Sequence, residues 1–260
     1  MKTVILCGGQ GTRIRDVADD IPKPMIQIGG RPILWHIMKG YAAAGHEDFI
    51  LCLGYKGSAI TEFFLDFEAR THDLTITLGP QRAVEIHGVR DPCNWRVTLA
   101  NTGTRALTGA RVRRIEKYIG DDETFLLTYG DGLSDVDISR LIDFHHAHGK
   151  TLTVTGVRPP GRFGEMEMSD DSRVLEFNEK PQASGGLISG GFFVCNRHLF
   201  SYLNDNEDLV LEQAPMRRLV EDGEMMVYRH DGFWQCMDTA RDHELLSRLW
   251  HAGDAPWKTW

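Results

Sequence analysis

The residues best suited to chemistry lie near the amino terminus, in the run Cys-Gly-Gly-Gln-Gly-Thr-Arg at positions 7–13. This run follows a short apolar segment, which places it at the end of an expected β-strand. Backbone amides without side-chain bulk can surround phosphate oxygens, and the planar guanidinium of Arg13 suits the same oxygens. Lys23 lies between Pro22 and Pro24, which stiffen the chain around its ammonium group. The residue types and their spacing therefore predict a local phosphate-binding site.

Two common glycine loops do not fit this run. The dinucleotide-binding fingerprint G-x-G-x-x-G aligns only from Gly9 to Ile14, so the last glycine, which permits close helix packing, is missing. The P-loop pattern G-x-x-x-x-G-K-[ST] occurs nowhere in the sequence. The sequence also lacks a convincing Ser-His-Asp or Cys-His set. We therefore expect chemistry that depends on positioning and on neutralising charge, not on a protein nucleophile.

Two aspartates are candidate metal ligands. Asp131 lies between two glycines in TYGDG at 128–132, where a buried strand is expected to end, and ligands bind at that edge of open α/β sheets. Its alternative role is a turn residue that caps the helix ahead. Asp238 lies in FWQCMDT at 233–239, and its alternative role is the N-cap of the last helix. Mg²⁺ prefers hard oxygen ligands and usually takes one or two carboxylates together with substrate phosphates.

The elements that must position these residues alternate between short apolar segments and amphipathic ones. We expect strands at 3–7, 49–53, 74–78, 95–99, 124–129 and 151–157. We expect helices at 32–45, 57–70, 109–119 and 137–148, with Gly45 as a C-cap and Asp137 at a helix opening. This alternation predicts an α/β fold, in which a mixed, mostly parallel sheet is flanked by helices.

The pattern changes after residue 157. Shorter strands are expected at 164–168, 174–178 and 188–195, with turns that indicate hairpins or mixed pairing. Helices at 211–222 and 241–250 flank a strand at 225–230. There is no linker rich in Pro, Gly or Ser and no internal repeat, so a single domain over 1–260 is the simplest interpretation.

The composition narrows the functional classes. A formal charge of −8 and a pI near 5.8 argue against a general nucleic-acid binder, because phosphate-backbone affinity needs summed basic charge. Five widely spaced cysteines without a Cys-x-x-Cys pair indicate neither a disulfide framework nor a thiolate zinc site, and favour a reducing compartment. The apolar run at the amino terminus is too short for a signal peptide, and no stretch is long enough to span a bilayer. We expect a soluble cytoplasmic protein that does not act on a membrane.

The run at 8–13, followed by Lys-Pro-Met at 23–25, resembles the sugar-1-phosphate nucleotidylyltransferases. Two linked motifs at this spacing are far more specific than a glycine loop alone. The resemblance extends over nearly the whole chain to the cytidylyltransferases of this family, through GGRPILWHIMK at 29–39, LTGARVRR at 107–114 and GGFFV at 190–194, among others. It implies the Rossmann-like fold of nucleotide-diphospho-sugar transferases. It also implies Mg²⁺ as cofactor, CTP and glucose 1-phosphate as substrates, a homo-oligomer, and a role in making nucleotide sugars for deoxysugars of surface polysaccharide.

The resemblance also implies roles for individual residues. Arg13 and Lys23 would be catalytic, and Asp131 and Asp238 would bind the metal. The implied nucleotide-binding residues are Leu6, Gly8, Gly9, Gly11, Thr12, Arg13, Lys23, Thr102, Gly103, Arg111, Tyr129 and Gly130. The implied sugar-phosphate-binding residues are Gly164, Glu179, Lys180, Ser189 and Gly190. The nucleotide-binding part would span about 1–157, and sugar-binding and oligomerisation elements about 158–260.

Several alternatives remain open at this point. Glu179 and Lys180 could form a solvated turn, and Arg111 could be a surface helix arginine. The cytidylyltransferases carry asparagine where this chain has Ser189, so another nucleotide or another sugar 1-phosphate is the main alternative. A non-catalytic relative should have lost charged site residues, and this chain keeps them.

Other side chains are expected to be structural. The histidines at 145–148 should complement the dipole at a helix end, and Cys7 and Cys236 should be small fillers. Trp234, Trp257 and Trp260 could stack on a ligand, but packing is at least as plausible.

Overall fold

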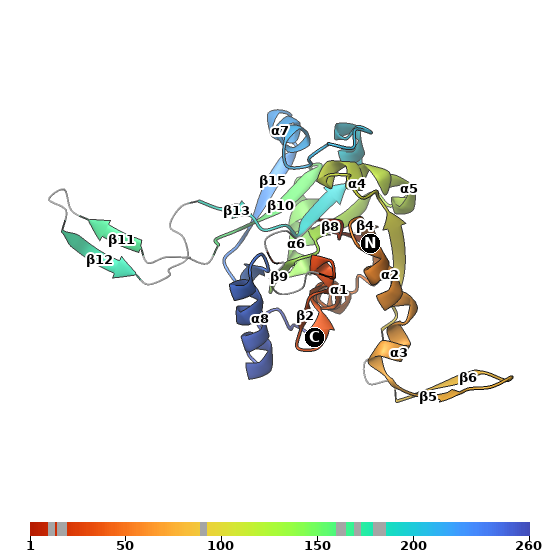
Figure 1. Cartoon of the computed structure of the whole chain (residues 1–260). Coiled ribbons are helices and arrows are strands. Elements are labelled where there is room, and N and C mark those ends of the chain that lie inside the picture. The colour runs from red at the N-terminus through yellow and green to blue at the C-terminus, as the bar shows by residue number, and fades with distance from the viewer. Residues whose placement is uncertain (10–13, 15–19, 89–92, 160–164, 169–172, 179–185) are drawn as a thin grey trace.

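The computed structural model describes residues 1–9, 14, 20–88, 93–159, 165–168, 173–178 and 186–260. An eight-stranded sheet forms the centre, with β1 (Lys2–Leu6) and β8 (Thr124–Tyr129) side by side in its middle (Figure 1). The strand order is β13-β10-β14-β8-β1-β4-β7, and β15 pairs with β10. The remaining strands of this sheet are β4 (Asp48–Leu53), β7 (Arg96–Asn101), β10 (Leu152–Val157), β13 (Ile188–Ser189), β14 (Phe193–Asn196) and β15 (Met225–His230).

The sheet is mixed, as predicted. The pairs of β1 with β4 and β8, of β4 with β7, and of β10 with β15 are parallel. The short strands β13 and β14 run antiparallel to their neighbours. The α/β class with a mostly parallel sheet is therefore confirmed.

Helices cover both faces of the sheet. Alternate residues of β1 enter two apolar clusters, Ile5 on one face and Val4 and Leu6 on the other, as expected for a strand buried on both sides. The first face is covered by α1 (Ile33–Ala43), α2 (Gly57–Leu65), α6 (Ile138–His148) and α8 (Ala240–Ala252). The second face is covered by α4 (Thr108–Arg114), α5 (Glu116–Ile119), the 3-10 helix η3 (Arg197–Tyr202) and α7 (Ala214–Glu221).

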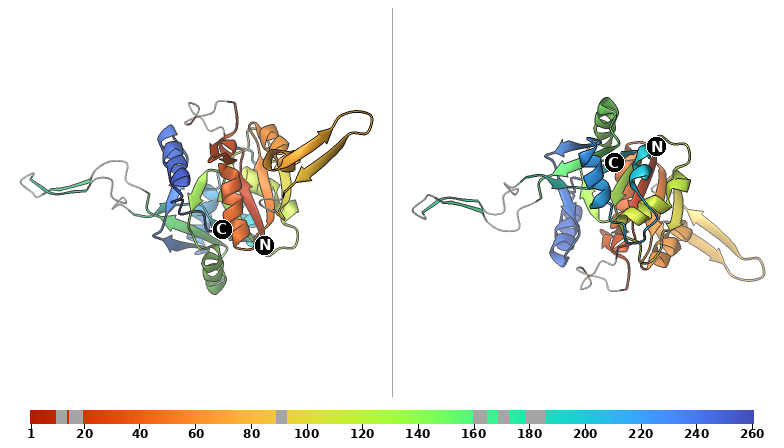
Figure 2. Two further views of the ribbon diagram at one scale, coloured as in Figure 1. Left: turned by 90° about the horizontal axis from the view of Figure 1, so that it is seen from below. Right: turned by 90° about the horizontal axis from the view of Figure 1, so that it is seen from above.

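Within the described part of the chain, four two-stranded sheets lie outside the central one. They pair β2 (Gln27–Ile28) with β3 (Arg31–Pro32), β5 (Asp73–Thr77) with β6 (Ala83–His87), β9 (Gly132–Ser134) with β16 (Trp234–Cys236), and β11 (Glu165–Met168) with β12 (Val174–Asn178). The β5–β6 and β11–β12 hairpins project away from the body in opposite directions (Figure 2). No helix among the described residues is long and apolar enough to cross a membrane.

Several predicted elements are broken or displaced. The segment expected as one helix over 57–70 is α2 followed by α3 (Phe67–Thr71), and the segment over 109–119 is α4 followed by α5. The strand expected over 188–195 is interrupted because Gly191 and Phe192 adopt positive φ angles of 76° and 49°, which extended backbone does not allow. The strand near 74–78 was expected in the main sheet, but it pairs with β6 in the projecting hairpin.

The predicted helix caps are confirmed. The Asp137 side chain accepts a hydrogen bond from the Arg140 amide at the start of α6. Gly45, with φ of 84°, follows the C-cap residue of α1. These local signals determine where both helices begin or end.

Candidate active site

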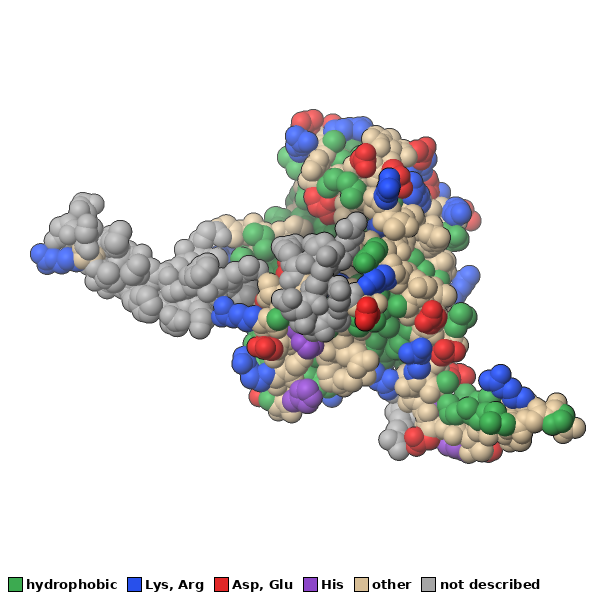
Figure 3. All heavy atoms as spheres, viewed as in Figure 1, with side chains coloured by type: hydrophobic (Ala, Val, Ile, Leu, Met, Phe, Trp, Pro, Cys, Tyr) green, Lys and Arg blue, Asp and Glu red, His purple; other side chains and the backbone are tan. Residues whose placement is uncertain are grey.

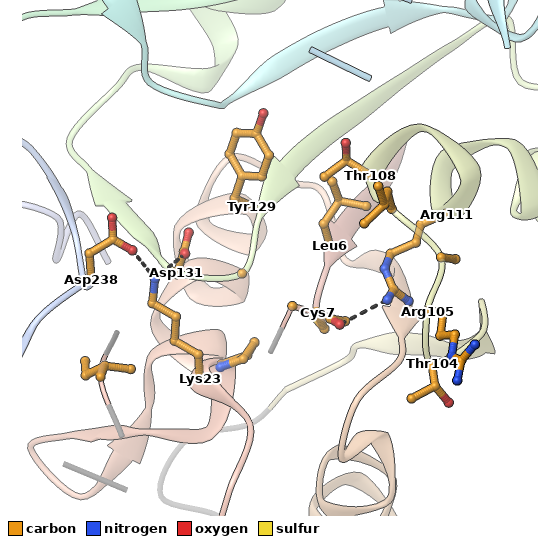
Figure 4. A pocket seen from close by; sticks show the side chains of 17 residues that line it. Leu6, Cys7, Lys23, Thr104, Arg105, Thr108, Arg111, Tyr129, Asp131 and Asp238 are labelled. Carbon is orange, nitrogen blue, oxygen red and sulfur yellow. Dashed lines mark hydrogen bonds and ion pairs between the residues drawn. The ribbon is translucent and has the colours of Figure 1, made fainter. Parts of the chain in front are cut away.

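Three charged side chains from distant parts of the chain meet beside the end of β8. Lys23 belongs to the 3-10 helix η2 (Lys23–Met25), Asp131 follows β8, and Asp238 follows β16. The Lys23 Nζ lies 2.6 Å from Asp131 Oδ2 and also forms an ion pair with Asp238 Oδ1 (Figure 4). Lys23, expected to be catalytic, therefore lies against both of the aspartates expected to bind the metal.

The charge state of this cluster follows from its surroundings. Burial alone would lower the pKa of Lys23, but the neighbouring Asp131 and Asp238 carboxylates outweigh burial and raise this pKa above its usual value. The Lys23 side chain is only 12% exposed. The Lys23 side chain therefore stays a charged ammonium group at neutral pH, held between the Asp131 and Asp238 side chains.

The alternative role of Asp131 as a helix cap is wrong. The segment after Asp131 is β9, and the next helix, α6, is capped by Asp137. The strand pairing of β9 with β16 places Gly132 opposite Cys236, and the Met237 amide donates to the Asp131 carbonyl over 2.9 Å. This pairing brings the segment of Asp238 beside Asp131.

The alternative role of Asp238 as the N-cap of the last helix is also wrong. Thr239 is the N-cap of α8, in a capping box with Asp242. The Asp242 carboxylate accepts hydrogen bonds from the amides of both Asp238 and Thr239. Asp238 therefore takes no part as a cap, and its side chain extends toward Lys23.

A cavity of about 380 Å³ opens between this cluster and the start of α4. Gly8 and Gly9, at the end of β1, line its floor together with Pro24 and Gly130. The predicted contributions of Gly11, Thr12 and Arg13 lie outside the described residues. The full lining is Leu6, Cys7, Gly8, Gly9, Ile14, Lys23, Pro24, Thr104, Arg105, Ala106, Leu107, Thr108, Arg111, Tyr129, Gly130, Asp131 and Asp238.

Arg111 is not a surface helix arginine. It is only 4% exposed, and burial lowers the pKa of its guanidinium from the usual value. Its Nη2 donates to the Gly8 carbonyl over 3.0 Å, and its Nη1 lies within hydrogen-bond distance of three acceptors, one at the end of β4 and two just after β7. Those acceptors are the Leu53 carbonyl, the Thr102 hydroxyl and the Gly103 carbonyl. The guanidinium therefore joins the carboxyl ends of three neighbouring parallel strands.

Glycine is required at two positions around this guanidinium. A Cβ atom at Gly8 or at Gly54 would overlap the Arg111 guanidinium. Thr102 and Gly103, expected to contact the nucleotide, contact Arg111 and are not part of the cavity lining. Their described role is support for Arg111. Gly54 begins the run GYKG at 54–57, and Thr102 and Gly103 end the run TLANTG at 98–103. Sequence spacing did not indicate that these residues would face the Arg111 side chain.

A second, smaller hollow of about 230 Å³ adjoins the first. Ser189 and Gly190, both predicted to bind the sugar phosphate, line it together with Trp234, whose indole N–H donates to the Gly190 carbonyl over 2.8 Å. Asp131, Asp238 and Tyr129 line both hollows. The charged cluster therefore lies at the junction of two hollows. The predicted sugar contacts of Gly164, Glu179 and Lys180 lie outside the described residues.

Sequence reasoning missed part of this lining. The segment 104–108 forms one wall of the large cavity, and the only signal for it was its position directly after the TLANTG motif. Trp234 was considered for stacking or packing, and it lies at the edge of the second hollow. Trp257 is buried, and its ring packs against Phe233 and Trp250, so core packing is its role.

The thiols at the site are fillers, as predicted. Burial raises the pKa of the Cys7 thiol well above its usual value, and burial beside Asp238 and Asp131 raises the pKa of Cys236 to about 12. Both thiols are therefore protonated and are poor nucleophiles. Burial also raises the pKa of Tyr129, with the Glu212 carboxylate adding to the effect, so its phenol stays a hydrogen-bond donor.

The histidine cluster is structural, but for a different reason than expected. His145 Nδ1 and His148 Nε2 both lie within hydrogen-bond distance of the Thr153 hydroxyl, at 2.8 and 2.7 Å. Burial lowers the pKa of His145 to about 4, so its imidazole is neutral at pH 7. It therefore bonds to the sheet as a neutral ring and does not complement the helix dipole as a cation.

Residues 2–242 match the nucleotidyl transferase family. The chain is 49% identical to the glucose-1-phosphate cytidylyltransferase of Salmonella typhi and 44% identical to a probable glucose-1-phosphate cytidylyltransferase of Bacillus subtilis, and covers 100% of each. Among solved structures, HddC from Yersinia pseudotuberculosis has a TM-score of 0.68 at 22% identity, over 96% of this chain and 99% of that one. At this identity the structural match shows a shared fold.

Proposed function

Because the chain belongs to the nucleotidyl transferase family, we propose that it transfers the cytidylyl group of CTP to glucose 1-phosphate, giving CDP-glucose and pyrophosphate. The relatives that are 49% and 44% identical over their full length carry this activity in their names. One observation carries the proposal, namely that Lys23, Asp131 and Asp238 meet where two hollows adjoin. A transfer between two phosphorylated substrates needs such a junction.

The carboxylate pair fits a divalent cation. Asp131 and Asp238 already hold a cationic group, the Lys23 ammonium, between their oxygens. Two carboxylates are also the number that Mg²⁺ usually takes when substrate phosphates supply further oxygens. Asp131 and Asp238 would therefore hold Mg²⁺, which would neutralise negative charge on the triphosphate and on the departing pyrophosphate.

The larger cavity is assigned to CTP and the smaller hollow to the sugar phosphate. Gly8 and Gly9 leave their backbone open to the triphosphate, and the segment 104–108 forms the opposite wall. A phosphate oxygen of glucose 1-phosphate attacks the α-phosphorus from the side of Ser189 and Gly190. The new phosphorus–oxygen bond forms as the bond to the β-phosphate oxygen breaks, and pyrophosphate leaves.

Lys23 supplies positive charge at the point where the two substrates meet. An ammonium group in a partly buried site attracts phosphate oxygens more strongly than one in water, because fewer water molecules screen it. Arg13 is proposed to do the same for the leaving pyrophosphate. The protein contributes alignment and charge, while the attacking oxygen belongs to the sugar phosphate.

The test is a pyrophosphate-release assay across the common nucleoside triphosphates and several hexose 1-phosphates, with and without Mg²⁺. We expect CTP with glucose 1-phosphate to be the best pair, and activity to require the metal. Lys23→Ala and Asp131→Asn should each lower kcat by roughly 100-fold or more, because each removes a charge from the reacting centre. Near-normal turnover in either variant would contradict the mechanism.

Ser189 bears on the choice of substrates. It lines the smaller hollow in place of the asparagine found in the cytidylyltransferases, and a hydroxyl lacks the paired donor and acceptor of an amide. Ser189 therefore contacts the sugar or the nucleotide with a different set of hydrogen-bonding groups than the asparagine does. Including Ser189→Asn in the assay panel shows whether this position sets the preference for the sugar or for the nucleotide.

A homo-oligomer is also proposed. On the β5–β6 hairpin, Ile76 pairs with Val84 and Leu74 with Ile86, which gives one apolar face. Ile76, Val84 and Ile86 are exposed, and hydrophobic side chains gather on this hairpin in Figure 3. A two-stranded hairpin is marginally stable alone, so a second copy of the chain is the proposed cover for this face. Light scattering on the intact protein measures the oligomer mass.

The cytoplasm is the proposed compartment. Cys7, Cys52, Cys195 and Cys236 are free thiols, which favours a reducing environment.

A further inference from the structure

Glu212 bridges two walls of the large cavity without lining it. The Tyr129 hydroxyl donates a hydrogen bond to Glu212 Oε1 over 2.5 Å, and the Thr108 hydroxyl donates to Glu212 Oε2 over 2.6 Å. Tyr129 is the last residue of β8, and Thr108 is the first residue of α4. One carboxylate therefore joins the strand that leads to Asp131 with the helix that carries Arg111.

The segment before Glu212 is itself fastened to α4. The amides of Gly109 and Ala110 donate to the Leu209 carbonyl, and the Leu107 amide donates to the Glu207 carbonyl. The Leu211 amide donates to the Thr108 hydroxyl over 3.0 Å. These bonds satisfy amides at the start of α4, and they fix the position from which the Glu212 side chain reaches Tyr129.

Tyr129 forms the partition between the two hollows, because it lines both of them. Gly191 lies against its ring so closely that a Cβ atom there would come within 2.9 Å of the Tyr129 Cδ2. The ring of Phe193 packs against it edge-on, with ring centroids 5.7 Å apart. These contacts hold the ring from one side, and the bond to Glu212 holds its hydroxyl end.

We propose that Glu212 is a positioning residue for the transfer reaction, a role that rests on the proposed function. Its carboxylate fixes the Tyr129 partition and the start of α4 relative to each other, so that the two substrates meet in line at Lys23 and Asp131. Glu212 is not a phosphate ligand, because a carboxylate repels phosphate and both of its oxygens already accept hydroxyl hydrogens. It acts through Tyr129 and Thr108.

The test compares kcat and KM for both substrates in Glu212→Ala, Glu212→Gln and Tyr129→Phe. Misalignment affects the reaction more than binding, so we expect kcat to fall roughly 10- to 100-fold in Glu212→Ala with KM values nearly unchanged. Glu212→Gln keeps one acceptor oxygen and should lie between Glu212→Ala and the wild type. Because the two residues act through one contact, the double variant of Glu212→Ala with Tyr129→Phe should be no worse than the poorer single variant.

Two further measurements separate positioning from a general loss of structure. The exposed Glu221, on α7, provides the matched control, and Glu221→Ala should retain wild-type kcat and Tm. With 3-fluorotyrosine incorporated, the Tyr129 line among the six tyrosines is assigned by its loss in Tyr129→Phe. This fluorine line should shift or broaden in Glu212→Ala and stay in place in Glu221→Ala.

The outcomes distinguish this inference from the proposed function. An unchanged kcat in Glu212→Ala, additive losses in the double variant, or an unmoved Tyr129 line would each overturn the role of Glu212. If the wild-type protein releases no pyrophosphate from CTP and glucose 1-phosphate, the proposed substrates are wrong. The kcat and KM values of the Glu212 and Tyr129 variants are then measured with the nucleotide and sugar phosphate that the substrate panel identifies. The same three results would overturn the role of Glu212.

Discussion

Among individual residues, Asp238 and Thr239 are adjacent in the chain but have different roles. Asp238 contributes a carboxylate to the Lys23 cluster, whereas Thr239 begins α8. The Asp242 side chain serves the cap by accepting from the Thr239 amide and hydroxyl. Asp238 therefore faces the charged cluster, whereas Thr239 caps the helix that follows.

This division leads to a prediction for two single variants. Asp238→Asn should lower kcat by roughly 100-fold or more, because it removes one of the two carboxylates at the junction, and should leave the free energy of unfolding nearly unchanged. Thr239→Ala should lower the free energy of unfolding by about 1 kcal/mol through the lost cap, and should keep most of the activity. Urea unfolding and the pyrophosphate assay measure both effects. The same pattern of losses in the two variants would contradict separate roles.

Among the secondary-structure elements, α4 organises the large cavity. Its Arg111 side chain contacts Gly8 after β1, Leu53 at the end of β4 and Gly103 after β7. A buried guanidinium needs its donors satisfied, and four acceptors surround this one. The helix thus holds the carboxyl edge of the sheet in the shape that the cavity requires.

A methyl group added at Gly8, beside the Arg111 guanidinium, should lower the free energy of unfolding. In Gly8→Ala the added Cβ would overlap the Arg111 guanidinium and displace a buried cation from its acceptors. We expect a loss of about 3 kcal/mol in the free energy of unfolding, together with strongly reduced turnover. Gly9→Ala is the matched control for stability, because no atom of the described residues lies within 4 Å of a Cβ at that position. Equal unfolding curves for the two variants would show that Arg111 is not held as described.

At the level of the whole molecule, two buried neutral histidines, His36 and His145, make the free energy of unfolding depend on pH. His36 Nε2 lies 2.9 Å from the Ile28 carbonyl, and the Trp257 indole N–H points to His36 Nδ1 over 3.4 Å. Burial lowers the pKa of His36 to about 4, as it does for His145. The two rings lie in different parts of the core, so their effects should add.

The sign of the pH dependence follows from proton binding. In the unfolded chain both imidazoles take up a proton near their usual pKa of 6.5, whereas in the folded protein they stay neutral until about pH 4. The unfolded chain therefore binds more protons between these values, and the free energy of unfolding falls as the pH is lowered from 6.5 toward 4. Each histidine should contribute about 3 kcal/mol to this loss.

Urea unfolding at several pH values between 7 and 4 tests this expectation. His145→Gln should remove roughly half of the slope that His36 and His145 contribute together, because Gln does not titrate. A pH dependence that is the same in His145→Gln and in the wild type would contradict the assignment.

The sequence by itself determined the features that depend on local patterns. The alternation of apolar segments predicted the mixed, mostly parallel sheet, because strand and helix periodicities are properties of neighbouring residues. The glycine run, the stiffened Lys23 and the position of Asp131 after a strand pointed to the edge of the sheet where the large cavity lies. The caps at Asp137 and Gly45 were predictable for the same reason, since they involve residues within one turn.

Only the tertiary structure decided which distant side chains meet and which way they face. Asp238 lies 215 residues from Lys23, and the pairing of β9 with β16 brings it there. The helical position of Arg111 did not indicate that its guanidinium is buried under Gly8, and nothing local connected Glu212 with Tyr129. Spacing along a chain specifies the face of an element, but the partner of that face depends on packing across the whole fold.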